Sequence, residues 1–129
     1  MKAFDERNAA LALGEKRFYS QAFQHAGFAV EFALKFRIMR LSGMNRWPDR
    51  EDRRDLYIHD LGRLSVHAGL TDALLAEIGN QSQVGLAWLV AKDWSVETRY
   101  DPMPFPPRRA LDMLKAVGDM GLLEWLIRP

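Results

Sequence analysis

The sequence predicts an all-α protein, an up-down helical bundle of four to five helices that occupies residues 1–129 as a single domain. Apolar residues recur three and four positions apart in several segments, which is the spacing of one helix face. No run alternates apolar and polar residues in the manner of a half-buried strand. A chain of 129 residues buries roughly two-thirds of its unfolded surface, which is enough for one core without metals or crosslinks.

Glycines divide the first half of the chain into a short helix, a long helix, a charged loop and another short helix. Their expected bounds are about Ala3–Leu13, Lys16–Ser42, Met44–Arg54 and Ile58–Ala68. Gly14, Gly43 and Gly69 follow the three helices, where glycine commonly ends a helix. The loop is rich in charge and is expected to be solvated with internal ion pairs, or else to form an edge that binds phosphate.

The second half of the chain predicts two further helices. Thr71 suits an N-cap, and a second long helix is expected from there to about Glu97, although Gly79, Asn80 and Gly85 leave a break open. Prolines then exclude a helix until Pro107, which suits the first position of a last helix that runs to about Ile127. The two long helices are expected to form the spine of an antiparallel bundle.

Composition excludes several classes of protein. The 18 Lys and Arg residues against 17 Asp and Glu give a net charge of +1, without the strong basic footprint of a dedicated nucleic-acid binder. The absence of cysteine excludes disulfides, zinc thiolate sites and thiol nucleophiles. The N-terminal residues lack the apolar run of a signal peptide, and charges interrupt every apolar stretch before it could span a membrane. We therefore expect a cytoplasmic protein without membrane association.

The long helix near the N-terminus is apolar nearly all round. At about 100° per residue its polar strip is narrow and consists of Gln24, Glu31, Lys35 and Ser42. One apolar flank consists of Phe28, Phe32, Phe36 and Met39. Because one small bundle is expected to cover only one broad side of such a helix, a second copy of the chain should cover this flank. The sequence thus predicts a homodimer with these four residues at the contact.

Two arginines of the same helix, Arg37 and Arg40, fall among its alanines rather than on the polar strip. Small neighbours let a ligand approach closely, and two guanidinium groups could bind phosphate in a bidentate way. Alternatively, both side chains extend past the core and pair with carboxylates of the charged loop. Arg99 is a third candidate for the phosphate site, or else it binds the last carbonyls of its own helix.

Three short motifs resemble the HEPN family, the helical domains of higher eukaryotes and prokaryotes. Ala29–Lys35 (AVEFALK) is similar to the family's AVEKALK helix, and His59–Leu61 (HDL) resembles the HDL that opens its short third helix. Arg99–Pro102 (RYDP) is similar to the RYP that follows a long later helix. The order and spacing match over about residues 15 to 127. The resemblance implies an up-down bundle, usually dimeric, and adds His59 and Tyr100 to a possible nucleotide site.

The resemblance also implies alternative functions. Some HEPN proteins are metal-independent ribonucleases, often toxins of toxin–antitoxin or defence systems, and others are partners of minimal nucleotidyltransferases or bind nucleotides without known chemistry. The ribonucleases carry an Arg and a His with four to six residues between them near the last helices. After Arg99 the matching positions are Pro104–Pro106, so that His is missing. Arg54 and His59 have the spacing elsewhere, where an imidazole and a fixed cation could assist attack by a ribose hydroxyl.

Structural roles are the competing interpretation of these residues. His59 could bond a neighbouring helix end or carboxylate, with Asp60 serving the first turn of its own helix. His25 and His67 lack partners at ligand spacing, so neither a metal site nor a cofactor is expected. The sequence therefore favours a non-catalytic HEPN-like binding or regulatory protein that engages a nucleotide, RNA or a nucleotidyltransferase. The alternatives are a ribonuclease toxin and an interaction module without a nucleotide.

Overall fold

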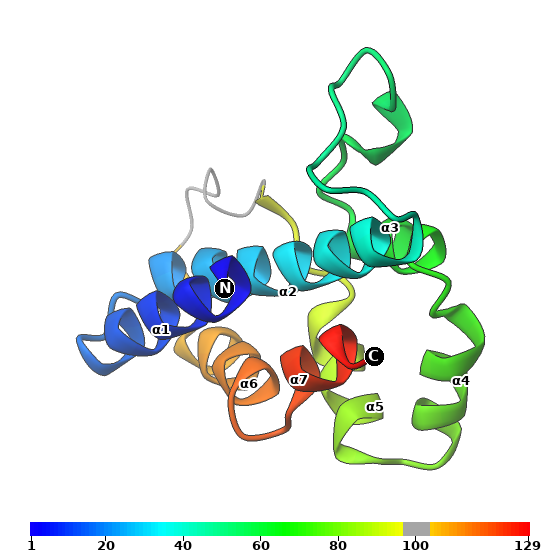
Figure 1. Ribbon diagram of the computed structural model, residues 1–129. Coiled ribbons are helices and arrows are strands. Elements are labelled where there is room, and N and C mark those ends of the chain that lie inside the picture. The colour runs from blue at the N-terminus through cyan, green and yellow to red at the C-terminus, as the bar shows by residue number, and fades with distance from the viewer. Residues whose placement is uncertain (97–103) are drawn as a thin grey trace.

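The computed structural model describes residues 1–96 and 104–129, and within these ranges the chain is all helical. Figure 1 shows α2 through the middle of the molecule, α1 beside it, α6 and α7 on the side opposite the arm between α2 and α3, and α3–α5 at the far end. The described α-helices are α1 (Lys2–Glu15), α2 (Tyr19–Leu41), α3 (Leu61–His67), α4 (Thr71–Gly79), α5 (Gln83–Ala91), α6 (Pro107–Val117) and α7 (Leu122–Ile127). A 3₁₀ turn at Arg54–Leu56 precedes α3.

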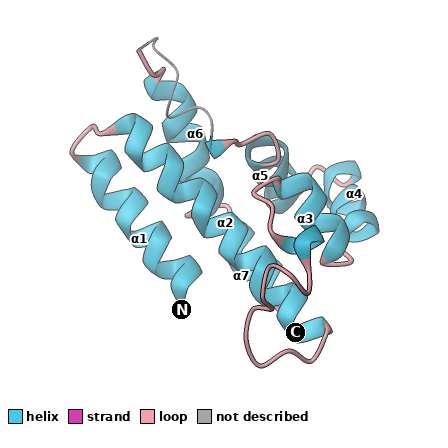
Figure 2. Ribbon diagram, turned by 90° about the horizontal axis from the view of Figure 1, so that it is seen from above, coloured by secondary structure: helices cyan, strands magenta, loops and turns pink. Residues whose placement is uncertain are grey.

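Helices α1 and α2 form an antiparallel hairpin (Figure 2). The turn between them is made by Arg17, whose φ of 64° lies in the left-handed region. Helix α1 therefore runs two residues past the predicted end at Leu13, to Glu15, and the prediction that Gly14 ends it was wrong. Gly14 lies inside the helix, where the side chain of Leu114 of α6 occupies the space that a Cβ would need. Because glycine has no Cβ, α1 can pack closely against α6 at this position.

The long helix α2 matches its prediction closely, and Gly43 follows it with the expected positive φ of 65°. Gly69 ends α3 in the same way, with a φ of 69°. Asp60 caps α3, since its side chain accepts a hydrogen bond of 3.0 Å from the backbone N–H of Arg63. The ends at Gly43 and Gly69 and the role of Asp60 in the first turn of α3 are local features, and the sequence predicted them correctly. The expected N-cap Thr71 was wrong by one residue, because it is the first residue of α4, and the N-cap is Leu70, which makes no side-chain cap bond.

The two helices predicted for the second half are each divided in two. Gln81, with a φ of 54°, breaks the expected long helix between α4 and α5, and Ser82 caps α5 by accepting from the N–H of Gly85. The break that the sequence left open is therefore present. Gly121, with a φ of 74°, separates α6 from α7. The prediction of one continuous last helix was wrong, and the described residues form seven α-helices with one long helix, α2, where four or five with two long ones were expected. The predicted all-α helical bundle is confirmed.

The buried side chains form one core around α2, because α1, α3, α6 and α7 all pack against that helix. The chain buries the side of α2 that carries Phe23, Val30 and Leu34, and it leaves the flank of Phe28, Phe32, Phe36 and Met39 partly exposed, as expected. Leu34, Val30 and Ala33 are fully enclosed by the chain itself.

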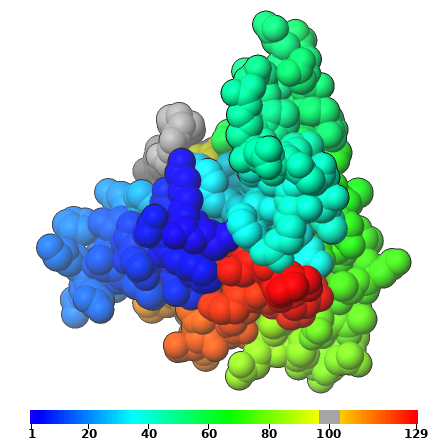
Figure 3. Space-filling model, in the orientation of Figure 1, coloured from blue at the N-terminus to red at the C-terminus, as the bar shows by residue number. Residues whose placement is uncertain are grey.

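The loop between α2 and α3 projects from the helical body as an arm (Figures 1 and 3). Within it, Arg53 and Asp55 form the expected internal ion pair, at 2.9 Å. Tyr57 donates a hydrogen bond of 2.6 Å from its hydroxyl to the carbonyl of Pro48, which closes the arm on itself. Among the described residues, no helix is both long and apolar enough to cross a membrane.

Candidate functional site

A polar pocket of about 600 Å³ opens between the start of α3 and the segment that follows α5. We call it the His59 pocket. Its lining consists of His59, Asp60, Gly62, Lys92, Asp93, Trp94, Ser95 and Val96. The two contributing segments are far apart in sequence, and both bond to α2, which therefore determines their relative position.

The imidazole of His59 lies at this pocket and is hydrogen-bonded to a buried carboxylate. Its Nδ1 lies 2.8 Å from Oε1 of Glu31, and Oε2 of Glu31 accepts from Nζ of Lys35 at 3.2 Å. The side chain of Glu31 is only 4% exposed, whereas that of His59 is 58% exposed. Because a carboxylate oxygen accepts, Nδ1 of the imidazole carries the hydrogen and Nε2 is left to interact with a ligand. The carboxylate thereby fixes both the orientation and the tautomer of the ring.

The sequence placed Glu31 and Lys35 on a polar strip at the helix surface. The pair forms as predicted, but Glu31 is buried, because His59 and the start of α3 cover it. The structural interpretation of His59, a bond to a carboxylate of a neighbouring helix, is confirmed. It does not exclude a functional role, since the ring is held and exposed at the same time.

Trp94 joins the second wall of the pocket to α2. Its indole Nε1 donates a hydrogen bond of 3.1 Å to the backbone carbonyl of Phe23, and its ring meets Phe28 edge to face at 5.3 Å between centroids. The ring lies directly over Gly27, where a Cβ would overlap it. Trp94 is 4% exposed, so its indole ring is buried within the protein and cannot stack on a base.

The charges of the pocket are mixed. Lys92 donates from its ammonium group to Asp93 at 3.1 Å, and both side chains are well exposed. Asp60 uses one carboxylate oxygen on the cap of α3. The pocket therefore offers a hydrogen-bond donor on Lys92 and acceptors on Nε2 of His59 and on the two aspartates. Sequence reasoning missed Lys92 and Asp93, because nothing in the sequence shows that the end of α5 faces the start of α3.

The predicted arginine site is not assembled at this pocket. Nη1 of Arg37 donates to the carbonyl oxygens of Leu126 and Arg128, at 3.1 and 2.9 Å, so this guanidinium caps the end of α7. Burial, followed by the neighbouring charges of Arg128 and Arg40, lowers the pKa of Arg37. Arg40 lies over the ring of Phe36, 4.6 Å from its centroid. Neither arginine pairs with a carboxylate of the arm, which was the alternative prediction.

The predictions for Arg99 and Tyr100 lie outside the described residues. Arg54, the partner of His59 in the alternative ribonuclease motif, is exposed on the 3₁₀ turn. Three of the predicted nucleotide-site residues lie in the described part of the chain. Of these, His59 lines the pocket, and Arg37 and Arg40 do not.

The four residues predicted at the dimer contact do not share one environment. Phe28 is partly covered by Trp94, and Lys2 lies over the ring of Phe32, with its ammonium nitrogen 4.4 Å from the centroid. Phe36 is exposed, and Met39 is half-buried. Phe32, Phe36 and Met39 line a second, apolar hollow. The homodimer stays a prediction, and the partly exposed flank of α2 that motivated it is present in the structure.

The other two histidines also meet carboxylates, contrary to the expectation that they lack acidic partners. Nδ1 of His25 lies 2.6 Å from Glu6 of α1, and Nδ1 of His67 lies 3.9 Å from Asp55 of the arm. Each pair joins two different elements, which sequence spacing does not reveal. In residues 1–96 and 104–129, no three His, Asp or Glu side chains gather closely enough to hold a metal ion.

Comparison with known proteins gives no identification. The chain matches no protein-family model, no curated protein and no solved structure. The candidate site therefore rests on its own geometry, and the HEPN resemblance rests on the three motifs quoted above.

Proposed function

We propose that this chain is a non-catalytic, HEPN-like binding protein of the cytoplasm that holds a nucleotide, free or within RNA, in the His59 pocket. One observation carries the proposal: an exposed imidazole is held by the buried carboxylate of Glu31 at a pocket of about 600 Å³. Ligand sites for small molecules commonly measure about 300 to 1,000 Å³ and combine a few oriented polar groups.

The mixed lining favours the nucleoside part of such a ligand. A phosphate inside the pocket would face the carboxylates of Asp60 and Asp93, which repel it. Base amino groups and ribose hydroxyls, in contrast, donate hydrogen bonds to carboxylates and to Nε2 of His59, and hydroxyl oxygens accept them from Lys92. We therefore place the base and ribose within the pocket and the phosphate toward solvent.

Calorimetric titration with adenosine, guanosine, AMP and a short single-stranded RNA tests this proposal. We expect His59→Ala to weaken binding about tenfold, the effect of losing one oriented hydrogen bond to a ligand. His25→Ala is the matched control, because His25 also pairs with a glutamate but lies outside the pocket. Absence of binding to all four probes, or an equal loss in both variants, would refute the proposal.

A ribonuclease is the second candidate, and the Glu31–His59 pair is the observation that favours it. A carboxylate that orients an imidazole with a free Nε2 is the arrangement of a general base. Incubation of purified protein with RNA in the presence of EDTA tests it. Cleavage that is lost in His59→Ala and retained in His25→Ala would establish the enzyme and displace the non-catalytic proposal.

The resemblance adds a homodimer and a nucleotidyltransferase partner to the proposal, with a toxin–antitoxin or defence system as the setting. The exposed Phe36 and the half-buried Phe28, Phe32 and Met39 are the residues proposed for the dimer contact. Sedimentation equilibrium at high protein concentration tests the dimer. A monomer over the whole concentration range would remove it.

A further inference from the structure

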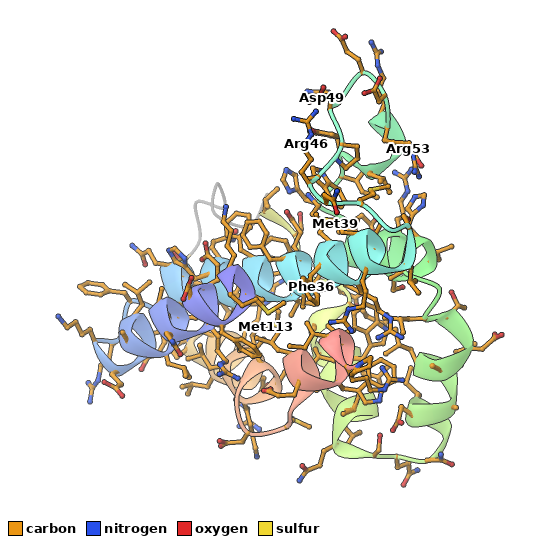
Figure 4. All side chains as sticks on the ribbon, in the orientation of Figure 1. Phe36, Met39, Arg46, Asp49, Arg53 and Met113 are labelled. Carbon is orange, nitrogen blue, oxygen red and sulfur yellow. The ribbon has the colours of Figure 1, made fainter. Side chains whose placement is uncertain are left out.

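A second hollow, of about 420 Å³, lies where the start of α1, the second half of α2 and the base of the arm meet. We call it the Phe36 groove. Its lining consists of Met1, Lys2, Ala3, Phe32, Lys35, Phe36, Met39 and Trp47. Figure 4 shows Phe36 and Met39 on α2, below the arm that carries Arg46, Asp49 and Arg53. Figure 3 shows the same three chain segments close together on one face.

The groove combines an apolar wall with a cationic rim. Aromatic rings and a thioether make up the wall, and no described carboxylate is among its lining residues. Lys2 and Lys35 supply the charge. The ammonium group of Lys2 has only the Phe32 ring as its described partner, at 4.4 Å, so no acidic side chain neutralises it there.

The two lysines are not equivalent. Lys35 is bound to Glu31, and its ammonium nitrogen lies 5.2 Å from the centroid of Trp47, so most of its charge is already compensated. Lys2 lies over Phe32 at the rim and is available to an incoming anion. Complementarity therefore requires one negative group near Lys2 and an apolar body that reaches along Phe36 and Met39 toward Trp47.

From this arrangement we propose that the Phe36 groove binds a small amphiphilic carboxylate, an aliphatic or aromatic acid with its carboxylate at Lys2 and its apolar part against the wall. The volume suits a small molecule. Ion pairing at the rim and burial of apolar surface along the wall both favour such a ligand, and each contribution is measurable by itself.

Titration calorimetry with octanoate, hexanoate and 1-octanol tests the two contributions. Burial of one methylene group contributes up to about fourfold in affinity, so octanoate should bind up to about 15-fold more tightly than hexanoate. Lys2→Gln should weaken octanoate binding about threefold to fivefold and leave octanol unchanged. Phe36→Ala should weaken both. These residues are at the surface, and thermal melts of each variant verify that it folds.

Two matched controls lie at the far end of α1. Lys16→Gln removes an exposed lysine, and Phe18→Ala removes a phenylalanine that is 50% exposed, neither of them in the groove. Equal effects of Lys2→Gln and Lys16→Gln would overturn the proposal, as would equal affinity for octanoate and octanol. So would self-association that Phe36→Ala abolishes without binding of either probe, because a second copy would then occupy the groove. No nucleotide is involved, so this result is independent of the His59 pocket.

Discussion

The His59 pocket and the Phe36 groove differ in chemistry, although one carboxylate of α2 bonds to a residue of each. Glu31 holds His59 of the pocket with one oxygen and Lys35 of the groove with the other. The pocket has mixed charges and both donors and acceptors, whereas the groove has an apolar wall and only positive charge. Glu31 is thus the described side chain that bonds to both surfaces.

The pocket depends on long-range packing more than the groove does. Trp94 carries one wall of the pocket and lies against Gly27 in the middle of α2. The groove is built mainly from α2 itself and from segments close to it in sequence or in the hairpin with α1. Damage to the Trp94 contact should therefore affect the pocket strongly and the groove weakly.

The largest effect is expected for Gly27→Ala. The added Cβ would overlap the buried ring of Trp94, and overpacking of this kind costs about 1 to 3 kcal/mol of unfolding free energy. Gly79→Ala is the control, since nothing lies within 4 Å of its Cβ position. Urea denaturation measures the unfolding free energy of both variants. In a Trp94→Ala background, itself destabilised by about 3 to 5 kcal/mol, Gly27→Ala should cost much less. An equal cost in both backgrounds would contradict the contact.

The Gly27–Trp94 contact also shows the limit of sequence reasoning. The bounds of α2, its terminal Gly43, the Asp60 cap and the Glu31–Lys35 pair were all predictable, because each depends on residues within about one helical turn. The contact of Gly27 with Trp94 joins residues 67 positions apart, and helical periodicity carries no information on it.

The errors in the sequence predictions have the same origin. Gln81 adopts a left-handed conformation that no local pattern requires, so the break between α4 and α5 was only an open alternative. The division at Gly121 turned α7 back onto α2, where its end meets Arg37. Because the sequence analysis did not predict this turn, it could not show that Arg37 binds carbonyl oxygens of its own chain.

Replacing the shared carboxylate should affect both surfaces. Glu31→Gln removes the charge that His59 and Lys35 both face, and we expect a loss of about 1 to 3 kcal/mol in unfolding free energy. Glu15→Gln, at an exposed position at the end of α1, is the control. NMR spectra of the His59 ring should change in the first variant alone. If both variants behave alike, Glu31 does not connect the two surfaces.

A smaller effect is expected at Arg37, which belongs to neither surface. Arg37→Gln leaves the carbonyls of Leu126 and Arg128 without their donor and should cost about 1 to 2 kcal/mol. Hydrogen exchange should speed up in α7, while nucleotide and octanoate titrations should stay unchanged. Arg40→Gln serves as the control, because it removes only a contact with the exposed Phe36 ring. Loss of nucleotide binding in Arg37→Gln alone would restore the arginine site that the sequence predicted.

The smallest effect concerns the arm, which supplies Trp47 to the groove. The hydrogen bond and charge of Arg53 lower the pKa of Asp55, whose carboxylate also faces His67 of α3. A lowered native pKa means that the ionised form stabilises the arm above the ordinary carboxyl value of about 3.9. That contribution is lost as the pH falls through the native value. NMR titration of Asp55 should therefore show an acidic midpoint that rises toward the ordinary value in Arg53→Gln but not in Arg50→Gln. A midpoint that Arg53→Gln leaves unchanged would show that the ion pair does not hold the arm, and the groove wall would then depend on the Tyr57–Pro48 bond.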